Sequence, residues 1–291
     1  MQLSVPWRFG QKRPFTSIPR INWAHPLAYK LVFYGYDTGT GLTIDLVRGL
    51  RPTLLNSPHP SNRPTPLGSG SLFVNAGGSY TFPATNFVNN ILTDGISSIA
   101  SGWYLTALPS NTFAGVFGIN DSGSTTQSTI LLEQTNTADM QWSCNNTNAT
   151  PIRGNTINAF HTFVGSGVSA TSQKWYFDGA LKQTNALTAS VTTATALVCF
   201  NSNSSGASGG NTVPGWIYYG ALWDRAITAG EALQLHLDPY CFLIYPEDEM
   251  FASLVGPAAA VVTSPTWGWE PESAQKYIFA QHRRGAGGSP R

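Results

Sequence analysis

The sequence PGWIYYGALWDRAITAGEALQLHLDPYCF, residues 214–242, contains the two strongest structural signals of the chain. Its first half, Trp216–Trp223, is aromatic or apolar at almost every position, which is typical of a strand that is buried on both faces. The polar pair Asp224 and Arg225 ends this run. The sequence therefore predicts a buried strand here.

A short helix is predicted directly after this strand. Thr228 and Glu231 form a capping box, in which the Thr side chain accepts the Glu231 backbone N–H and the Glu side chain accepts the Thr N–H. Pro239 ends the helix because proline disfavours its continuation. The positions that helical spacing places on one face are Ala229, Ala232, Leu233, His236 and Leu237.

Composition favours an all-β protein. Charged residues make up 11% of the 291 residues, against roughly 25% in typical soluble domains, while aromatic residues reach 12%. Gly, Ser, Thr, Asn and Pro are abundant, so many short strands joined by turns are expected rather than helices or disorder. A net charge of +1 provides no field that would attract nucleic acid or an anionic membrane.

Short strand-like runs recur between turn clusters along the middle of the chain. This spacing predicts a two-sheet antiparallel sandwich. Asp178-Gly179 is the best hairpin signal, since both central residues of a type I′ turn need positive φ. The runs are 102–108, 113–119, 129–134, 139–144, 159–164, 174–177 and 196–200.

Three segments resemble a known family. The run 217–239, IYYGALWDRAITAGEALQLHLDP, resembles the closing strand and helix of concanavalin A-like jelly rolls of the laminin G type. Residues 175–181, WYFDGAL, are similar to the aromatic strand and Asp-Gly hairpin of that family, and residues 21–27, INWAHPL, to the opening segment of such domains in tailed-phage virion proteins. The resemblance implies an all-β, two-sheet antiparallel jelly-roll sandwich with one short C-terminal helix. It implies function only loosely.

The chain divides into three predicted regions. Residues 1–26 form a proline-rich N-terminal extended arm, 27–245 the concanavalin A-like sandwich, and 246–291 a C-terminal extended arm. Arms at both ends of one sandwich suit assembly with other proteins. The candidate partner-binding residues are the aromatic and basic side chains of the arms, namely Trp7, Arg8, Phe9, Arg13, Phe15, Arg20, Trp267 and Trp269.

Metal sites and targeting segments are weakly represented. Cys144, Cys199 and Cys241 show no Cys-x-x-Cys spacing, so zinc is not expected; buried free thiols are expected, with one disulfide left open. No cofactor is predicted, although loops bearing Asp37, Asp94 and Asp121 could hold calcium. The N-terminus lacks the apolar core of a signal peptide, and no apolar run could span a bilayer, so synthesis in a host cytoplasm without membrane insertion is expected.

Glycan binding and glycan hydrolysis each require particular residues. Trp103, Trp142 and Trp175 could stack on sugar rings if exposed, although a Trp in a strand is more often part of the core. Jelly-roll glycan hydrolases carry carboxylates alternating on one strand. No Glu-x-Asp-x-Glu pattern occurs in this sequence, so hydrolysis is not favoured.

The function predicted first is that of a non-enzymatic structural protein of a tailed-phage virion, most simply a capsid decoration or cement protein. Its partners would be other virion proteins, with homo-oligomers in the particle, and its arms would anchor it. The alternative is a glycan-binding, lectin-like tail or receptor-binding component that recognises a host-surface glycan. A glycan hydrolase is the third hypothesis.

Overall fold

The computed structural model describes fourteen segments of the chain. They are residues 18–37, 43–55, 71–73, 78–83, 98–109, 113–121, 130–135, 139–144, 147–148, 152–153, 156–169, 172–185, 196–201 and 212–245. The chain falls into two compact units, Met1–Pro246 and Glu247–Arg291, and all the described residues belong to the first.

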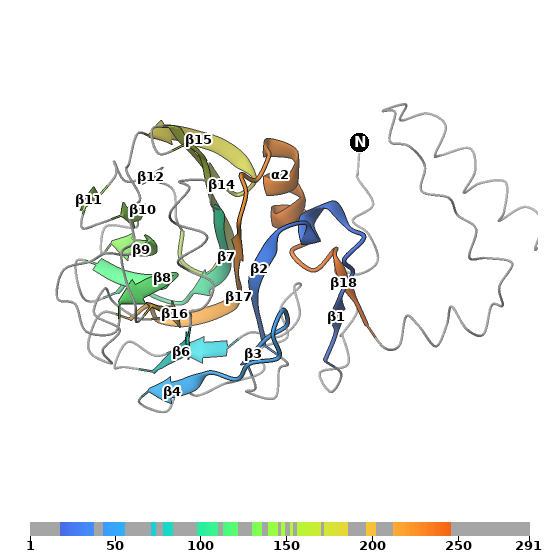
Figure 1. Ribbon diagram of the computed structural model, residues 1–291. Coiled ribbons are helices and arrows are strands. Elements are labelled where there is room, and N and C mark those ends of the chain that lie inside the picture. Colours follow the sequence, from blue (N-terminus) through green and yellow to red (C-terminus); the bar gives the residue numbers. More distant parts are fainter. Residues whose placement is uncertain are drawn as a thin grey trace, which may run out of the picture. The chain divides into compact units, whose positions relative to one another are not determined.

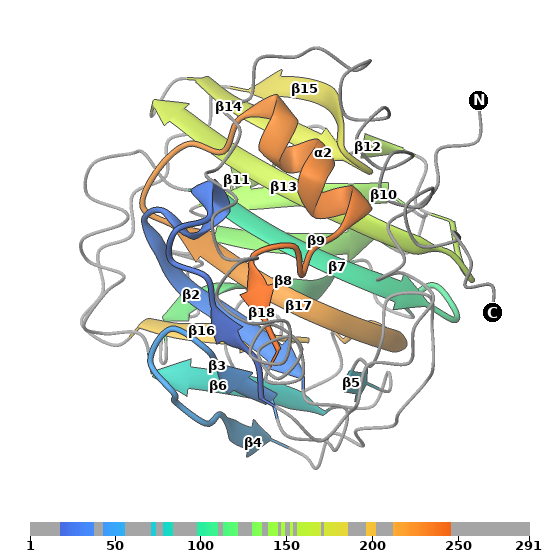
Figure 2. The ribbon, with the colours of Figure 1, turned by 90° about the vertical axis from the view of Figure 1, so that its right-hand side faces the viewer.

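The described residues form a sandwich of two eight-stranded sheets, in which neighbouring strands are antiparallel (Figures 1 and 2). In the first sheet the order is β11-β10-β9-β8-β16-β6-β4, with β12 beside β10; in the second it is β15-β14-β13-β7-β17-β2-β3, with β5 beside β17. The prediction of an all-β sandwich is therefore confirmed.

The strands of the first sheet are β4 (Thr53–Leu55), β6 (Ser79–Pro83), β8 (Phe113–Asp121), β9 (Ile130–Thr135), β10 (Asp139–Cys144), β11 (Thr147–Asn148), β12 (Ile152–Arg153) and β16 (Ala196–Phe200). Those of the second are β2 (Leu31–Asp37), β3 (Thr43–Asp45), β5 (Ser71–Phe73), β7 (Ser98–Leu105), β13 (Phe160–Ser169), β14 (Ser172–Phe177), β15 (Ala180–Asn185) and β17 (Gly215–Trp223). The remaining elements are β1 (Arg20–Ile21), the 3₁₀ helix η2 (Pro26–Ala28), α2 (Ala229–Leu237) and β18 (Leu243–Ile244).

The predicted central strand is β17, and all nine of its residues are buried. Its register against β7 shifts between Ile217 and Tyr219, so the regular alternation of side chains is interrupted there. Ile217 and Leu222 consequently belong to the core between the sheets, whereas Tyr218 and Tyr219 both belong to a second cluster on the outer face. One strand thus contributes to two hydrophobic cores.

Two paired glycines allow the sheets to approach closely. Gly35 on β2 lies opposite Gly220 on β17. A Cβ atom at Gly220 would collide with the ring of Phe117 and lie 2.7 Å from Cζ of Phe200, both in the first sheet. The rings of Phe117 and Phe200 are themselves 4.7 Å apart between centroids. Glycine is required here because aromatic rings occupy the space of a side chain.

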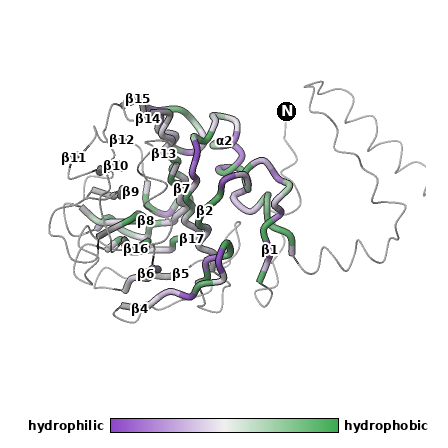
Figure 3. Tube along the Cα trace, viewed as in Figure 1, coloured by the Kyte–Doolittle hydropathy of each residue, from purple (hydrophilic) through white to green (hydrophobic). Residues whose placement is uncertain are grey.

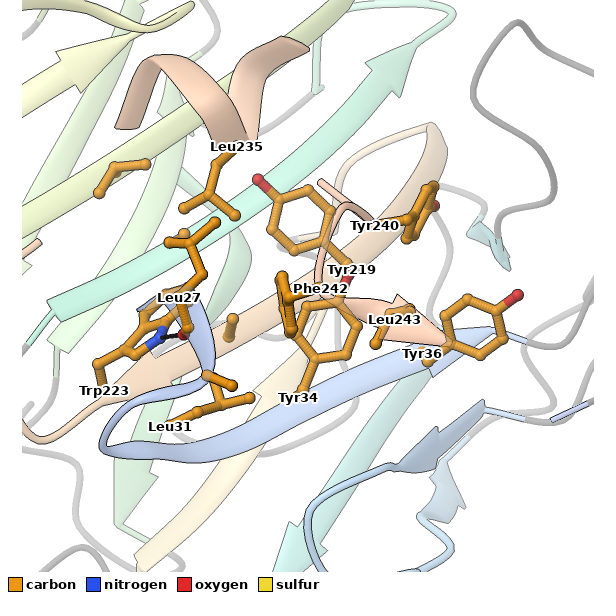
Figure 4. Close-up of a cluster of buried hydrophobic side chains, with 14 of the residues drawn as sticks. Leu27, Leu31, Tyr34, Tyr36, Tyr219, Trp223, Leu235, Tyr240, Phe242 and Leu243 are labelled. Carbon is orange, nitrogen blue, oxygen red and sulfur yellow. Dashed lines mark hydrogen bonds between the residues drawn. The ribbon is translucent and has the colours of Figure 1, made fainter. Parts of the chain in front are cut away.

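The outer face of the second sheet is covered by α2, η2, β1 and β18 (Figure 2). In Figure 4, Leu235 of α2 points toward Leu27 of η2, and both side chains are fully buried. The indole N–H of Trp223 donates to the carbonyl of Leu27 at 2.7 Å. Figure 3 shows hydrophobic residues in the segment near β1 as well as in the sandwich. Packing and buried hydrogen bonds therefore join this layer to the sheet.

Several local predictions are confirmed. The capping box of Thr228 and Glu231 is formed, and α2 ends at Leu237, before Pro239. Asp178 and Gly179 connect β14 to β15 with φ of 50° and 74°, as a type I′ turn requires. The side chain of Cys241 is half-buried, while the side chains of the other two cysteines lie outside the described set.

Other predictions need correction. On α2 the buried residues are Ala232 and Leu235, whereas Leu233 and Leu237 are exposed. Leu233 and Leu237 lie on one face of the helix and Leu235 on the opposite face, so spacing alone could not identify the face that contacts the sheet. Residues 18–26, assigned from sequence to the N-terminal arm, include β1, which pairs with β18 and belongs to the sandwich unit.

Among the described residues, no helix is long and apolar enough to cross a membrane.

Candidate functional site

An exposed tryptophan stands on a tight turn directly after β1. Asn22 fixes the turn through its backbone N–H, which donates to the carbonyl of Phe242 at 2.9 Å. Its side-chain Oδ1 accepts the N–H of Ala24 at 3.2 Å, and its carbonyl accepts the N–H of His25 at 3.0 Å. Between these fixed positions, Trp23 is 58% exposed. An aromatic ring on a hydrogen-bonded turn loses little backbone entropy when it binds a ligand.

A pocket of about 390 Å³ opens beside this ring, and we call it the Trp23 pocket. Its apolar walls can accept the apolar face of a ligand, and Arg20 is the one charged residue among the described residues of its lining. Arg20 lies on β1, where it pairs with Ile244 of β18. The lining residues are Ile18, Pro19, Arg20, Ile21, Trp23, Ile44, Leu46, Val47 and Gly49.

The second wall of the pocket is a turn that follows β3 and is organised by Asp45. The Asp45 carboxylate accepts the backbone N–H groups of Val47 at 3.0 Å and Tyr34 at 3.3 Å, and contacts Arg48 at 3.4 Å. The carbonyl of Asp45 also accepts the N–H of Gly49 at 2.7 Å. Burial raises the pKa of this carboxyl, against the lowering effect of its hydrogen bonds and of Arg48. These bonds fix the wall before any ligand binds.

The Trp23 turn is held in place by hydrogen bonds that involve η2 and Arg225. Nδ1 of His25 accepts the N–H of Leu27 at 3.1 Å and so caps η2. The imidazole of His25 therefore makes a structural hydrogen bond. Arg225 donates to the carbonyls of Pro26 at 3.0 Å and Tyr29 at 2.8 Å. The segment that carries Trp23 is therefore held at both its ends.

This arrangement suits noncovalent recognition. It offers an exposed aromatic ring, an apolar recess and one cationic side chain on a preformed surface, which are features of small-ligand sites. Over the described part of the chain, no group of three or more His, Cys, Asp or Glu residues could hold a metal ion. Asp94 and the side chains of Asp37 and Asp121, the calcium candidates, lie outside that part.

The tryptophans predicted to bind glycan lie elsewhere. Trp103 and Trp175 are fully buried in the core between the sheets, so neither ring can stack on a sugar, and the prediction is wrong for both. Their strands present these positions inward, where a large apolar ring is favoured. Trp142 lies in β10, and its side chain is outside the described set.

The predicted partner-binding residues are mostly outside the described segments. Trp7, Arg8, Phe9, Arg13, Phe15, Trp267 and Trp269 all belong to this group. Arg20 is exposed and lines the Trp23 pocket. Trp23 was missed as a binding candidate, although its position between Asn22 and Pro26 marks a turn and not a strand.

A second polar cluster joins β13, the Asp178-Gly179 hairpin and α2. The carboxylate of Asp178 contacts Nδ1 of His161 at 2.9 Å and accepts the backbone N–H of Thr162 at 2.9 Å. The hydroxyl of Thr162 in turn lies 3.0 Å from Nδ1 of His236 on α2. Nε2 of His161 is surrounded by backbone and hydroxyl atoms of Thr156, at 3.0–3.1 Å. The cluster fixes the hairpin and helix to the sheet.

Comparison with known proteins shows similarity at the level of fold. No protein-family model matches the chain, and a search of curated protein sequences finds no match. A sialidase from Trypanosoma rangeli in complex with a 2,3-difluoro nononic acid covers 74% of this chain at 16% identity, with a TM-score of 0.54. The same enzyme in complex with sialic acid gives 14% identity, 74% coverage and a TM-score of 0.53. A mutant of this sialidase with trans-sialidase activity gives 14% identity, 77% coverage of this chain and a TM-score of 0.52.

The chain spans about a third of the length of these sialidases, 33%, 34% and 36% respectively. At such identities the likeness establishes the fold alone. The prediction of a non-enzymatic capsid decoration protein is nevertheless corrected, because the structures named above that share the fold are sialidases, which are enzymes.

Proposed function

We propose that this protein is a carbohydrate-binding protein that holds glycans at the Trp23 pocket. The observation that carries the proposal is the 58% exposed ring of Trp23, on a hydrogen-bonded turn beside an open pocket. The indole would stack on the C–H face of a sugar ring, and the apolar recess would take an apolar substituent. Arg20 would contact hydroxyl or anionic groups at the rim.

Two further considerations support the proposal. Solved structures that share the fold include sialidases, one of them in complex with sialic acid. The finer assignment of the sandwich to the concanavalin A-like jelly rolls, a group that includes lectins, agrees with the same function and is part of the proposal. Neither consideration identifies the glycan, so the experiment must survey several.

The test is binding to immobilised oligosaccharides, including sialyllactose, lactose and chitobiose, followed by titration of any ligand found. We expect Trp23→Ala to weaken binding about tenfold or more, as truncation of an aromatic anchor typically costs above 1 kcal/mol. Tyr29→Ala is the matched control, because Tyr29 is 65% exposed in the same segment but does not line the pocket.

Equal losses for both variants would place binding elsewhere, and unchanged binding by Trp23→Ala would refute the site. Release of free sugar from the same oligosaccharides, measured in parallel, separates binding from hydrolysis. Sugar release would show that the protein is an enzyme as well as a binder.

A further inference from the structure

The histidine next to the Trp23 turn acts as a hydrogen-bond acceptor. Nδ1 of His25 receives the backbone N–H of Leu27 at 3.1 Å, which requires a lone pair on that nitrogen. The neutral imidazole must therefore carry its proton on Nε2. Protonation would place a second N–H on the ring, and the imidazolium could no longer accept from Leu27.

The surroundings of His25 come from three segments. From α2, Nε2 of Gln234 lies 3.5 Å from Nε2 of His25, and the carboxylates of Glu231 and Asp238 act on it through their charge. From the segment after α2, the ring of Phe242 packs with a centroid separation of 6.2 Å. From the end of β17, Arg225 forms an ion pair with Glu231 and donates to the carbonyl of Pro26.

These contacts leave a proton on Nδ1 of His25 without a favourable partner. The carboxylate of Glu231 is already bonded to Arg225 and Thr228. The new N–H would face the N–H of Leu27, so both the cap of η2 and the position of the imidazole would be lost. Because the N–H of His25 also closes the turn that displays Trp23, the disturbance reaches the ligand site through one residue.

We propose that His25 is a proton-controlled support of the Trp23 turn, so that glycan binding at the pocket is strong when His25 is neutral and weakens when acid protonates it. This inference rests on the proposed carbohydrate binding at Trp23. Its structural part, loss of the η2 cap on protonation, stands independently of the ligand.

Burial of His25 lowers its pKa from the ordinary 6.5, against the opposing influence of Glu231 and Asp238. The neutral form is therefore the one present at neutral pH, and the change takes place below pH 6.5. Binding that requires the neutral ring loses up to about tenfold in affinity for each pH unit below the pKa of the folded protein.

The first experiment uses whichever oligosaccharide the array identifies and compares affinity near neutrality with affinity at about pH 5. We expect the wild-type protein to bind more weakly in acid. His25→Asn supplies an amide oxygen that can cap η2 but does not titrate, so its affinity should be the same at both pH values. His236→Gln removes another half-buried histidine with a lowered pKa, on α2, and should keep the pH dependence.

The second experiment needs no ligand. Amide hydrogen exchange of residues 18–30, corrected for the intrinsic effect of pH, should show lower protection in acid for the wild type and not for His25→Asn. The ¹⁵N shift of the His25 ring should show an unprotonated Nδ1 at neutral pH, which is measurable on the wild-type protein even if a variant does not fold.

The outcomes separate the two proposals. The role of His25 would be overturned by any one of three results: binding by the wild type that does not depend on pH, an equal pH dependence in His25→Asn, or a protonated Nδ1 at neutral pH. Each of these would leave carbohydrate binding intact. Absence of binding at every pH would instead refute the proposed function. The exchange experiment would then still decide whether protonation of His25 releases the cap.

Discussion

The guanidinium of Arg225 donates two hydrogen bonds to the carboxylate of Glu231, from Nη1 to Oε2 at 2.9 Å and from Nη2 to Oε1 at 2.6 Å. Arg225 also donates to the carbonyls of Pro26 and Tyr29. Glu231 accepts the N–H of Thr228 as part of the capping box. One ion pair therefore joins the end of β17, the start of α2 and the segment beside Trp23.

Glu231→Gln should lower the free energy of unfolding by roughly 2–4 kcal/mol, because it leaves Arg225 without its charged partner in a largely buried position. Burial raises the pKa of Glu231, but the hydrogen bonds from Arg225 and Thr228 together outweigh it and hold the pKa below 4.5. The stabilisation is thus complete above pH 4.5 and is lost as pH falls through the lower folded-state pKa. Urea denaturation of both proteins over this range tests it.

The control for this prediction is Thr228→Ala, which removes the cap acceptor and keeps the ion pair. It should cost only about 1 kcal/mol and leave most of the acid sensitivity in place. If both variants lose the same stability at neutral pH, the ion pair contributes little beyond the cap.

Replacing each of two glycines by alanine should change the stability of the protein in opposite directions. Gly220→Ala should destabilise the protein by roughly 1–3 kcal/mol, because the added methyl group meets the rings of Phe117 and Phe200 in the packed core. Gly230→Ala should stabilise it by up to about 1 kcal/mol, since Gly230 lies in α2 with nothing within 4 Å of an added Cβ. Thermal denaturation of the two variants measures both effects. A stabilised Gly220→Ala would mean that the sheets can separate to accept the methyl group.

Local signals in the sequence predicted the elements well. The capping box, the Asp178-Gly179 turn and the buried strand at 216–223 each depend on neighbouring residues alone, and all three are present. The partners of the strands are a different matter, as the strands β5 and β6 show. β5 joins β17 in the second sheet, and β6 lies in the first sheet between β16 and β4. Pairing depends on contacts distant in sequence, which local patterns do not contain.

The candidate site was less predictable for the same reason. The Trp23 pocket combines residues 18–23 with residues 44–49, which are distant in sequence and come together only in the folded chain. Exposure could not be inferred from the residue type either, because Trp23, Trp103 and Trp175 are all tryptophans. What separates Trp23 is the turn made by Asn22, whose side chain accepts the N–H of Ala24.

The stability of the protein should fall in mild acid because of His236 as well as His25. Burial lowers the pKa of His236 from 6.5; Asp178 opposes this effect and His161 adds to it. The unfolded chain therefore binds more protons, so stability is complete above pH 6.5 and decreases as pH falls toward the folded-state pKa. His236→Gln should flatten the pH dependence of the urea midpoint between neutrality and about pH 5. An unchanged slope would show that the pKa of His236 is the same in the folded and unfolded states.

Substitutions of Trp103 and Trp23 should show that Trp103 is a core residue and that Trp23 contacts the ligand. The side chain of Trp103 is fully buried, and the centroid of its ring lies 6.3 Å from that of Phe177. Trp103→Phe should lower the free energy of unfolding by roughly 1–2 kcal/mol through lost packing and leave glycan affinity unchanged. Trp23→Phe should weaken glycan binding and leave the free energy of unfolding unchanged, because the Trp23 ring contacts solvent on a turn that is fixed by backbone hydrogen bonds. Denaturation and oligosaccharide titration on the same samples measure both quantities. Weakened binding by Trp103→Phe at full stability would return the site to the sandwich interior.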